Sequence, residues 1–241
     1  MDFKEQFVNN RSVNIHYLET EEYDENLTPL LYIPGAMNFA EQFINVMKFY
    51  SPRRCTLLSF RGRGQSEAPF SGYSLEHHVS DIESVVGDSK VQEFCLMAYS
   101  MGVPYAISYA SKYPEQIKGL ILCDYPAKYP SIQESWSEMV LAKGHISEER
   151  HHVVKGIQRE SREIMLDQEL LKISCPVLLL KGGTDDSFLK NPDVEVYINN
   201  LRYVDLKVFE ASGHELWVPD FMEFINTIKH FLITLDNTNT N

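Results

Sequence analysis

Short apolar runs alternate with amphipathic helical patterns along most of the chain, and this alternation limits the folds open to it. The runs at 28–33 and 55–60 are almost continuously apolar, which is typical of strands covered on both faces. Between them, residues 41–50 carry apolar side chains at the spacing of an amphipathic helix. Repeated units of this kind predict an α/β fold with a doubly wound, mostly parallel sheet of about eight strands.

The same rhythm predicts the remaining elements. Residues 12–18 alternate apolar and polar side chains, as a half-buried antiparallel strand does. Further strands are expected at 94–98, 117–123, 177–181 and 204–209, and helices at 78–86, 103–112, 194–201 and 218–235.

The stretch 125–174 interrupts the alternation. It contains no convincing strand, and its patterns at 132–142 and 148–171 are helical. A helical insertion between two sheet strands predicts a cap, or lid, over the edge of the sheet. We therefore expect a core formed by 1–124 and 175–241, a cap at 125–174, and a disordered polar tail at 236–241.

The charge balance excludes several kinds of partner. The 241 residues include 34 Asp and Glu against 22 Lys and Arg, a formal net charge of −12. Binding to nucleic acid phosphates or to an anionic membrane surface needs the opposite sign. The longest apolar runs, 120–123 and 177–180, are far shorter than a membrane span. We expect a small-molecule substrate, no nucleic acid partner and no membrane span, with the oligomeric state left open.

Compartment is indicated by the cysteines and by the start of the chain. Four cysteines lie in or beside apolar runs, which favours buried thiols in a reducing cytosol over a disulfide framework. The first residues lack the charged and then apolar pattern of a secretory signal. A cytoplasmic protein is the expectation. The cysteines are Cys55, Cys95, Cys123 and Cys175.

The sharpest local motif is Ala98-Tyr99-Ser100-Met101-Gly102, between an expected strand and an expected helix. A serine on such a tight turn has its hydroxyl lifted above the sheet, and the turn needs small residues two before and two after it. Gly102 meets this requirement, and Ala98 stands where glycine is usual. The string by itself also fits an ordinary helix N-cap.

Two other strand ends offer the groups that a serine nucleophile requires. Asp185 follows the strand at 177–181 and His214 follows the strand at 204–209. An imidazole can remove the serine proton when a carboxylate orients it, and such groups gather at the carboxyl ends of open sheets. The Gly-x-x-Asp spacing favours Asp185 as the acid, with Asp186 and Asp124 as alternatives.

With these motifs the chain resembles the α/β-hydrolase family over nearly its whole length. The resemblance implies Ser100 as nucleophile, Asp185 as acid and His214 as base. The stretch 32–37 resembles the family's oxyanion loop, so the backbone N–H groups of Ala36 and Met101 are the implied oxyanion donors.

A second family motif is the turn at 60–66, which matches Arg-Gly-x-Gly-x-Ser. Ser59 stands where the family more often has Asp, and this departure puts a structural contact in doubt rather than the catalytic residues.

Function is predicted from this set of residues. We expect a serine hydrolase that cleaves a carboxylic ester or related acyl substrate, with no cofactor and no metal. A serine nucleophile argues against the epoxide hydrolase and haloalkane dehalogenase relatives, which place Asp there. Aromatic and apolar residues near the cap either line the substrate pocket or attach the cap to the core: Met37, Tyr125, Tyr129 and Trp136.

Two alternatives remain open at this stage. The same triad serves C–C bond, lactone or thioester hydrolysis and perhydrolysis, because specificity lies in the cap and pocket. A low-turnover ligand sensor is the alternative from another class. Ester turnover that is lost in Ser100→Ala favours an enzyme, whereas ligand binding unchanged in that variant favours a sensor.

Overall fold

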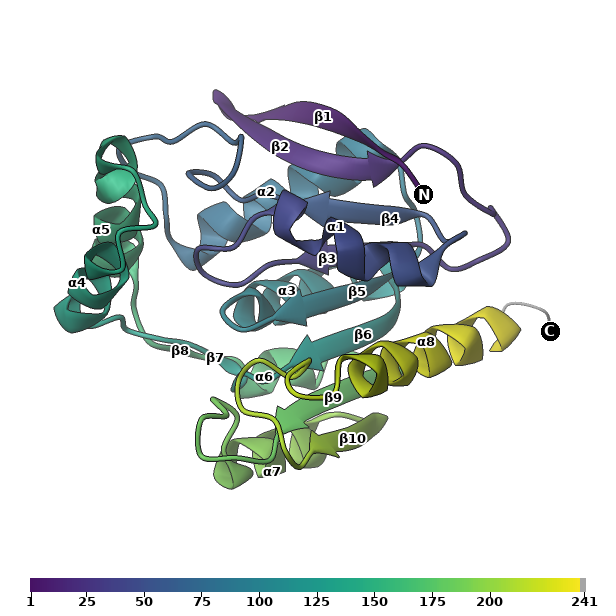
Figure 1. The fold of residues 1–241 in the computed structure, drawn as a ribbon. Helices are drawn as coiled ribbons and strands as arrows, with labels where there is room; N and C mark the ends of the chain where they lie inside the picture. The colour runs from purple at the N-terminus through teal and green to yellow at the C-terminus, as the bar shows by residue number, and fades with distance from the viewer. Residues whose placement is uncertain (239–241) are drawn as a thin grey trace.

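A computed structural model describes residues 1–238, and within them eight strands form one twisted sheet (Figure 1). The strand order is β1-β2-β4-β3-β5-β6-β9-β10, so β4 lies between β2 and β3, and the later strands follow outward from β5 to β10 on the other side of β3. β2 runs antiparallel to both of its neighbours, β1 and β4, and the other pairs are parallel. The strands are β1 Phe3–Asn10, β2 Val13–Thr20, β3 Leu30–Ile33, β4 Cys55–Leu58, β5 Phe94–Tyr99, β6 Ile117–Cys123, β9 Val177–Gly182 and β10 Val204–Phe209.

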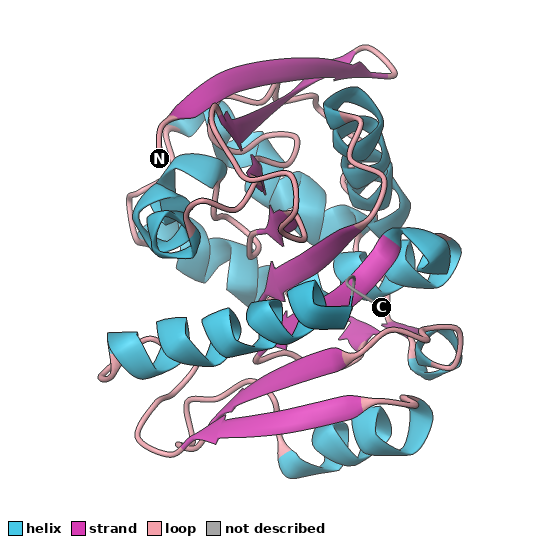
Figure 2. Cartoon of the chain, turned by 90° about the vertical axis from the view of Figure 1, so that its right-hand side faces the viewer, coloured by secondary structure: helices cyan, strands magenta, loops and turns pink. Residues whose placement is uncertain are grey.

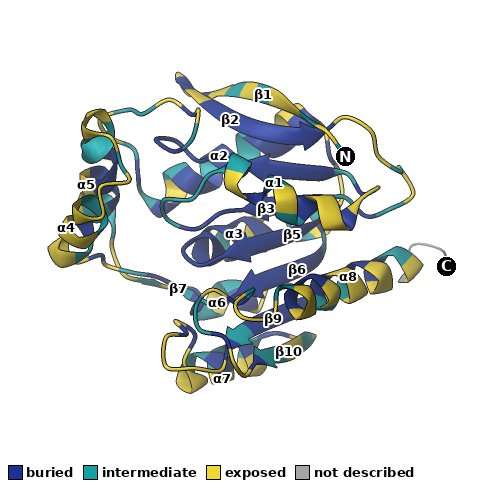
Figure 3. Cartoon of the chain, viewed as in Figure 1, coloured by how far each residue is buried: buried dark blue, intermediate teal, exposed yellow. Residues whose placement is uncertain are grey.

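The predicted α/β class and mostly parallel sheet are confirmed. The seven strands expected from the sequence are present, and β1 adds an edge strand that hydrogen-bonds along the whole of β2. The central strands β3 to β6 are buried on both faces, as their continuous apolar runs require (Figure 3).

Helices cover the two faces of the sheet and create two hydrophobic cores. One core packs residues of α2, α3, α6 and α7 against the sheet, and the other packs α1 and α8 against the opposite face (Figures 1 and 2). Among the described residues, no helix has the length and apolar character to cross a membrane. The helix bounds are α1 Ile44–Met47, α2 Leu75–Ser89, α3 Gly102–Lys112, α4 Glu134–Ala142, α5 His151–Glu160, α6 Asp167–Leu170, α7 Asn191–Asn200 and α8 Phe221–Thr238.

The insertion between β6 and β9 contains two short strands that its sequence did not predict. β7 Lys128–Tyr129 pairs antiparallel with β8 Ile164–Met165, and this ribbon leads to α4 and α5 at one end of the sheet (Figure 1). Val153 and Ile157 of α5 still pack into the hydrophobic core. Two-residue strands are too short to show a period in the sequence. The expected single helical stretch over 148–171 is likewise divided, because β8 separates α5 from α6.

The C-terminal end differs from the disordered tail expected at 236–241. Asp236 belongs to the last turn of α8, where it forms an ion pair with the buried guanidinium of Arg53 at 2.6 Å. Asp236 also accepts the backbone N–H of Thr28. These contacts join the end of α8 to the loops before β3 and β4, while residues 239–241 lie outside the described part of the chain.

A buried ion pair connects α2 to the turn at 60–66. Asp81 is fully buried and accepts hydrogen bonds from the Arg61 guanidinium at 2.6 and 2.9 Å, and from Asn10 at 2.8 Å. Because both charges are out of water, each depends on the other for compensation.

We predict that Asp81→Ala lowers the free energy of unfolding by about 3–5 kcal/mol, since it leaves the Arg61 charge buried and unpaired. Urea denaturation measures this loss. Glu83→Ala is the matched control on the same helix, because Glu83 pairs with the exposed Lys112. This variant should lower the free energy of unfolding by at most about 1 kcal/mol. Equal losses in the two variants would contradict the prediction.

Candidate active site

Ser100 occupies a strained turn between β5 and α3. Its φ of 54° lies in the left-handed region, which is costly for a residue with a side chain. The turn passes close to the loop after β3, since a Cβ on Gly102 would lie 2.6 Å from the carbonyl oxygen of Pro34. Glycine is therefore required at 102, as the sequence motif indicated.

The hydroxyl of Ser100 points at an imidazole. His214, from the loop after β10, places Nε2 at 2.9 Å from Ser100 Oγ. Its other ring nitrogen, Nδ1, lies 2.8 Å from Oδ2 of Asp124, the residue that directly follows β6. Three strand ends thus bring Asp124, His214 and Ser100 into one hydrogen-bonded line, with the geometry of a nucleophile, a base and an orienting acid.

Asp185 was the wrong choice for the partner of His214. The turn that follows β9, closed by the Ser187 N–H on the Thr184 carbonyl, leaves Asp185 exposed and brings the next residues back toward β6. Asp186 is exposed as well. Motif spacing placed a carboxylate at this strand end, but the turn leaves both side chains exposed, and His214 Nδ1 bonds Asp124 instead.

The Asp124 carboxylate is fully buried and receives four hydrogen bonds. Besides the His214 ring, its donors are the Ser187 hydroxyl at 2.5 Å and the backbone N–H groups of Gly182 at 3.0 Å and Phe188 at 2.8 Å. Burial alone raises the pKa of this carboxyl, but these hydrogen bonds together outweigh burial and hold the pKa below its ordinary value. Asp124 is therefore ionised at neutral pH.

Two aromatic rings enclose the imidazole, and the sequence did not reveal them. Phe188 stacks on His214 with ring centroids 3.8 Å apart, and Tyr99 stacks on it at 4.9 Å. The stacking limits rotation of the imidazole about its two hydrogen bonds. Tyr99 stood inside the serine motif, whereas Phe188 has no sequence signal because its position depends on the turn after β9.

The predicted oxyanion loop lies against the serine. A Cβ on Gly35 would lie 3.1 Å from the Cβ of Ser100, so the two backbones approach closely. Arg63 Nε donates to the Ala36 carbonyl at 2.8 Å and supports the loop from the side. Ser59, where the family more often has Asp, accepts the Ala40 N–H at 3.0 Å and so holds the start of the short helical turn at 40–43 that comes after the loop.

Comparison with known proteins agrees with this geometry. A family model described as "alpha/beta hydrolase fold" matches residues 28–155. A Bacillus subtilis protein assigned as a 2-succinyl-6-hydroxy-2,4-cyclohexadiene-1-carboxylate synthase is 38% identical, over 72% of this chain and 79% of that protein. This chain belongs to the α/β-hydrolase family.

Other relatives of this α/β-hydrolase are more distant. Epoxide hydrolase 1 of Caenorhabditis elegans is 27% identical over 55% of this chain, a match that spans about a third (34%) of that protein. The solved structure of a haloalkane dehalogenase loop variant from Bradyrhizobium elkanii matches with a TM-score of 0.80 over 100% of both chains, at 14% identity. That likeness shows the fold alone.

The four residues predicted for the substrate pocket separate in the structure. Met37 lines a cleft of about 440 Å³ between the turn at 60–66 and the loop before α5. The Tyr125 ring lies near Phe188, with centroids 6.4 Å apart, and Phe188 in turn stacks on His214. Trp136 packs against the core and is half-buried. Tyr129 is fully buried beside Tyr105, which makes it a core residue rather than a wall of an open pocket.

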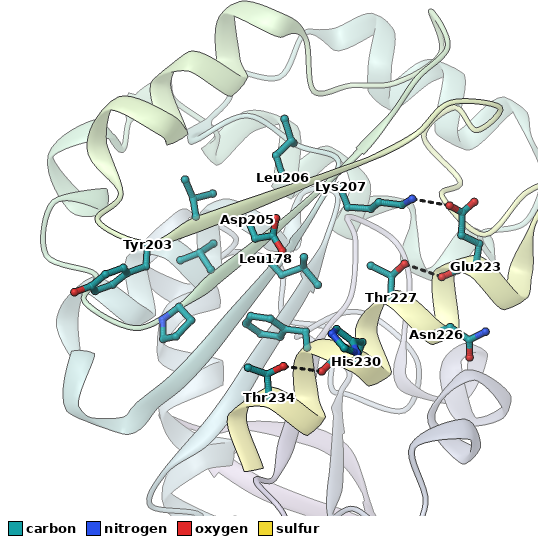
Figure 4. Close-up of a pocket in the computed structure, with 14 residues that line it drawn as sticks. Leu178, Tyr203, Asp205, Leu206, Lys207, Glu223, Asn226, Thr227, His230 and Thr234 are labelled. Carbon is teal, nitrogen blue, oxygen red and sulfur yellow. Dashed lines mark hydrogen bonds and ion pairs between the residues drawn. The ribbon is translucent and has the colours of Figure 1, made fainter. Parts of the chain in front are cut away.

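A larger cleft of this α/β-hydrolase lies elsewhere. It measures about 870 Å³ and lies between the edge strand β10 and α8 (Figure 4). Lys207 spans it to Glu223 at 2.6 Å, and its lining includes none of Ser100, Asp124 and His214. The cleft therefore has no part in the chemistry of these three residues.

We predict that Asp124→Asn lowers the free energy of unfolding by about 2 kcal/mol at pH 7, because a buried amide replaces a carboxylate that four donors require. A carboxyl whose pKa is lowered by folding stabilises the fold above its unfolded pKa, which is near 3.8. The difference in the free energy of unfolding between wild type and Asp124→Asn should therefore shrink as the pH falls below that value. Urea denaturation at a series of pH values measures it.

Asp185→Asn is the control for this series, and it should match wild type throughout because Asp185 is exposed. If the difference in the free energy of unfolding between wild type and Asp124→Asn stays constant down to pH 3, the charge of Asp124 does not stabilise the fold.

Proposed function

We propose that this protein is a serine hydrolase that cleaves a carboxylic ester or a related acyl compound through an acyl-enzyme. The observation that carries the proposal is the line of two hydrogen bonds from Asp124 through His214 to Ser100, at 2.8 and 2.9 Å. A serine hydroxyl becomes a useful nucleophile when a neighbouring imidazole accepts its proton.

The reaction follows from these contacts. Ser100 Oγ attacks the acyl carbon while His214 Nε2 accepts the hydroxyl proton, and the carbonyl electron pair moves onto oxygen. The backbone N–H groups of Ala36 and Met101 stabilise that oxyanion. When the tetrahedral intermediate collapses, the bond to the leaving group breaks and His214 returns the proton to it. Water then attacks the acyl-enzyme by the same route and regenerates Ser100.

Asp124 acts through the imidazole. Its ionised carboxylate accepts the Nδ1 proton, so that Nε2 faces the serine with a free lone pair. It also offsets the positive charge that the ring gains during the reaction. The buried thiols of Cys55, Cys95 and Cys123 support the reducing cytosol as the proposed compartment.

We predict that Ser100→Ala abolishes turnover of 4-nitrophenyl esters and that Asp124→Asn lowers kcat about 10⁴-fold, because the imidazole loses its orienting partner. Asp185→Asn is the matched control and should keep wild-type turnover. The assay follows nitrophenolate release across acyl chains of increasing length.

Two results would overturn the assignment. One is labelling by a serine-directed phosphonate at a site other than Ser100, mapped by mass spectrometry. The other is loss of turnover in Asp185→Asn with Asp124→Asn still active.

A second candidate function is supported by the Bacillus subtilis relative, which is 38% identical and is assigned as a synthase rather than an esterase. The same residues would then make 2-succinyl-6-hydroxy-2,4-cyclohexadiene-1-carboxylate. A bacterial strain that lacks its own synthase tests this candidate. Production of that compound must return with the wild-type gene and fail with Ser100→Ala.

A further inference from the structure

β10 is the last strand at one end of the sheet, and its outer side is open (Figures 1 and 2). On its inner side it pairs in parallel with β9, and the carbonyls of Tyr203 and Phe209 accept N–H groups from that side. Backbone groups alternate in direction along a strand, so the N–H and C=O groups of Val204, Leu206 and Val208 point outward. Within the described part of the chain these outward groups form no hydrogen bond. Such an edge can accept a further strand.

Two opposite charges flank the centre of β10. Asp205 and Lys207 lie on the α8 side of the sheet, where Lys207 forms its ion pair with Glu223 (Figure 4). Asp205 is exposed and forms no ion pair with another described residue. Between them Leu206 faces the other side and is 37% exposed. The run 204–208 is therefore Val-Asp-Leu-Lys-Val, which is symmetric about its centre except for the sign of the two charges.

This symmetry favours one antiparallel pairing of two copies of the strand. Residues that face each other across antiparallel strands lie on the same side of the sheet, so a two-fold axis passes beside a single residue. An axis at Leu206 places Asp205 of each copy opposite Lys207 of the other. An axis at Asp205 or at Lys207 would instead place like charges opposite each other, which destabilises a pair of strands.

The same axis also satisfies the open backbone groups. With Leu206 at the centre, Leu206 faces Leu206 of the second copy, and Val204 faces Val208. These are the residues whose N–H and C=O groups point outward, so each facing pair exchanges two hydrogen bonds. Charged residues commonly protect an edge strand from pairing, but in this register their signs attract.

We propose that the β10 edge joins two copies of this chain into a dimer with one continuous sheet, centred on Leu206. Two Asp205–Lys207 ion pairs form on the α8 side, and the two Leu206 side chains meet on the other. The strand has one acid and one base, so it adds no net repulsion where two chains of formal net charge −12 meet. The dimer is independent of the proposed function, because β10 supplies none of the residues of the candidate active site.

Charge reversal tests the pairing, and sedimentation velocity over a series of protein concentrations measures it. Wild type should form dimers. Lys207→Asp or Asp205→Lys alone places like charges opposite each other at both pairs, and each should raise the dimer Kd at least about ten-fold. The double variant Asp205→Lys/Lys207→Asp restores opposite charges and should return the wild-type Kd.

Two controls separate this pairing from other effects of charge. Glu223→Gln removes the ion pair of Lys207 within one chain. Lys229→Asp makes the same charge reversal at an exposed position of α8. Both should keep the wild-type Kd. The double variant also lacks the bond from position 207 to Glu223, so its recovery reports the contact between copies.

Leu206→Cys tests the position of the axis. Facing Cα atoms of a hydrogen-bonded antiparallel pair lie about 5.5 Å apart, a distance that a disulfide can bridge. Oxidation should therefore link two copies through this position, as measured by non-reducing electrophoresis and peptide mass spectrometry. The test uses a Cys175→Ser background, because Cys175 is the one native cysteine that is not fully buried among the described residues.

Three results would overturn the proposal. The first is a wild type that stays monomeric over the whole concentration series. The second is a dimer whose Kd is unchanged by both single reversals, or is not restored by the double variant, with folding of each verified by circular dichroism. The third is a dimer that Leu206→Cys does not cross-link, because it would place the interface on another surface.

Discussion

The buried carboxylate of Asp124 organises the carboxyl edge of the sheet. It ends β6, accepts the backbone N–H groups of Gly182 and Phe188 from β9 and its loop, and holds His214 from the loop after β10. Three chain segments far apart in sequence meet on one charged group. Since a buried charge without these donors would be very costly, the loops and the carboxylate stabilise each other. The orientation of the imidazole toward Ser100 follows from this arrangement.

The serine side of the site depends on close backbone approach instead of charge. Ser100 keeps a left-handed φ of 54°. Gly102 and Gly35 allow the turn between β5 and α3 to lie against the loop after β3. The strain is tolerated because β5 lies between β3 and β6 in a fully buried sheet. The same crowding surrounds Gly35, where an added Cβ would lie 2.9 Å from Asn38 Oδ1 and 3.4 Å from the Tyr99 ring.

Much of this arrangement could be predicted from the chain alone. Continuous apolar runs located the central strands, because a strand buried on both faces tolerates few polar residues. Ser100 and His214 were recognisable because each stands at a strand end in a small-residue turn. The ribbon of β7 and β8 was missed since two residues show no period, and the end of α8 was read as a polar tail because its partner, Arg53, is distant in sequence.

The sequence by itself determined the fold class, the edge of the sheet that carries the site and the identities of its serine and histidine. Local sequence is sufficient for these three features, because burial and tight turns restrict which residue types can occupy a position. Only the tertiary structure decided which carboxylate meets His214. Asp124 and Asp185 both follow parallel strands, and the path of the loop after β9 turns one of them outward while enclosing the other. A hydrogen bond between residues 90 positions apart depends on backbone geometry that no local pattern records.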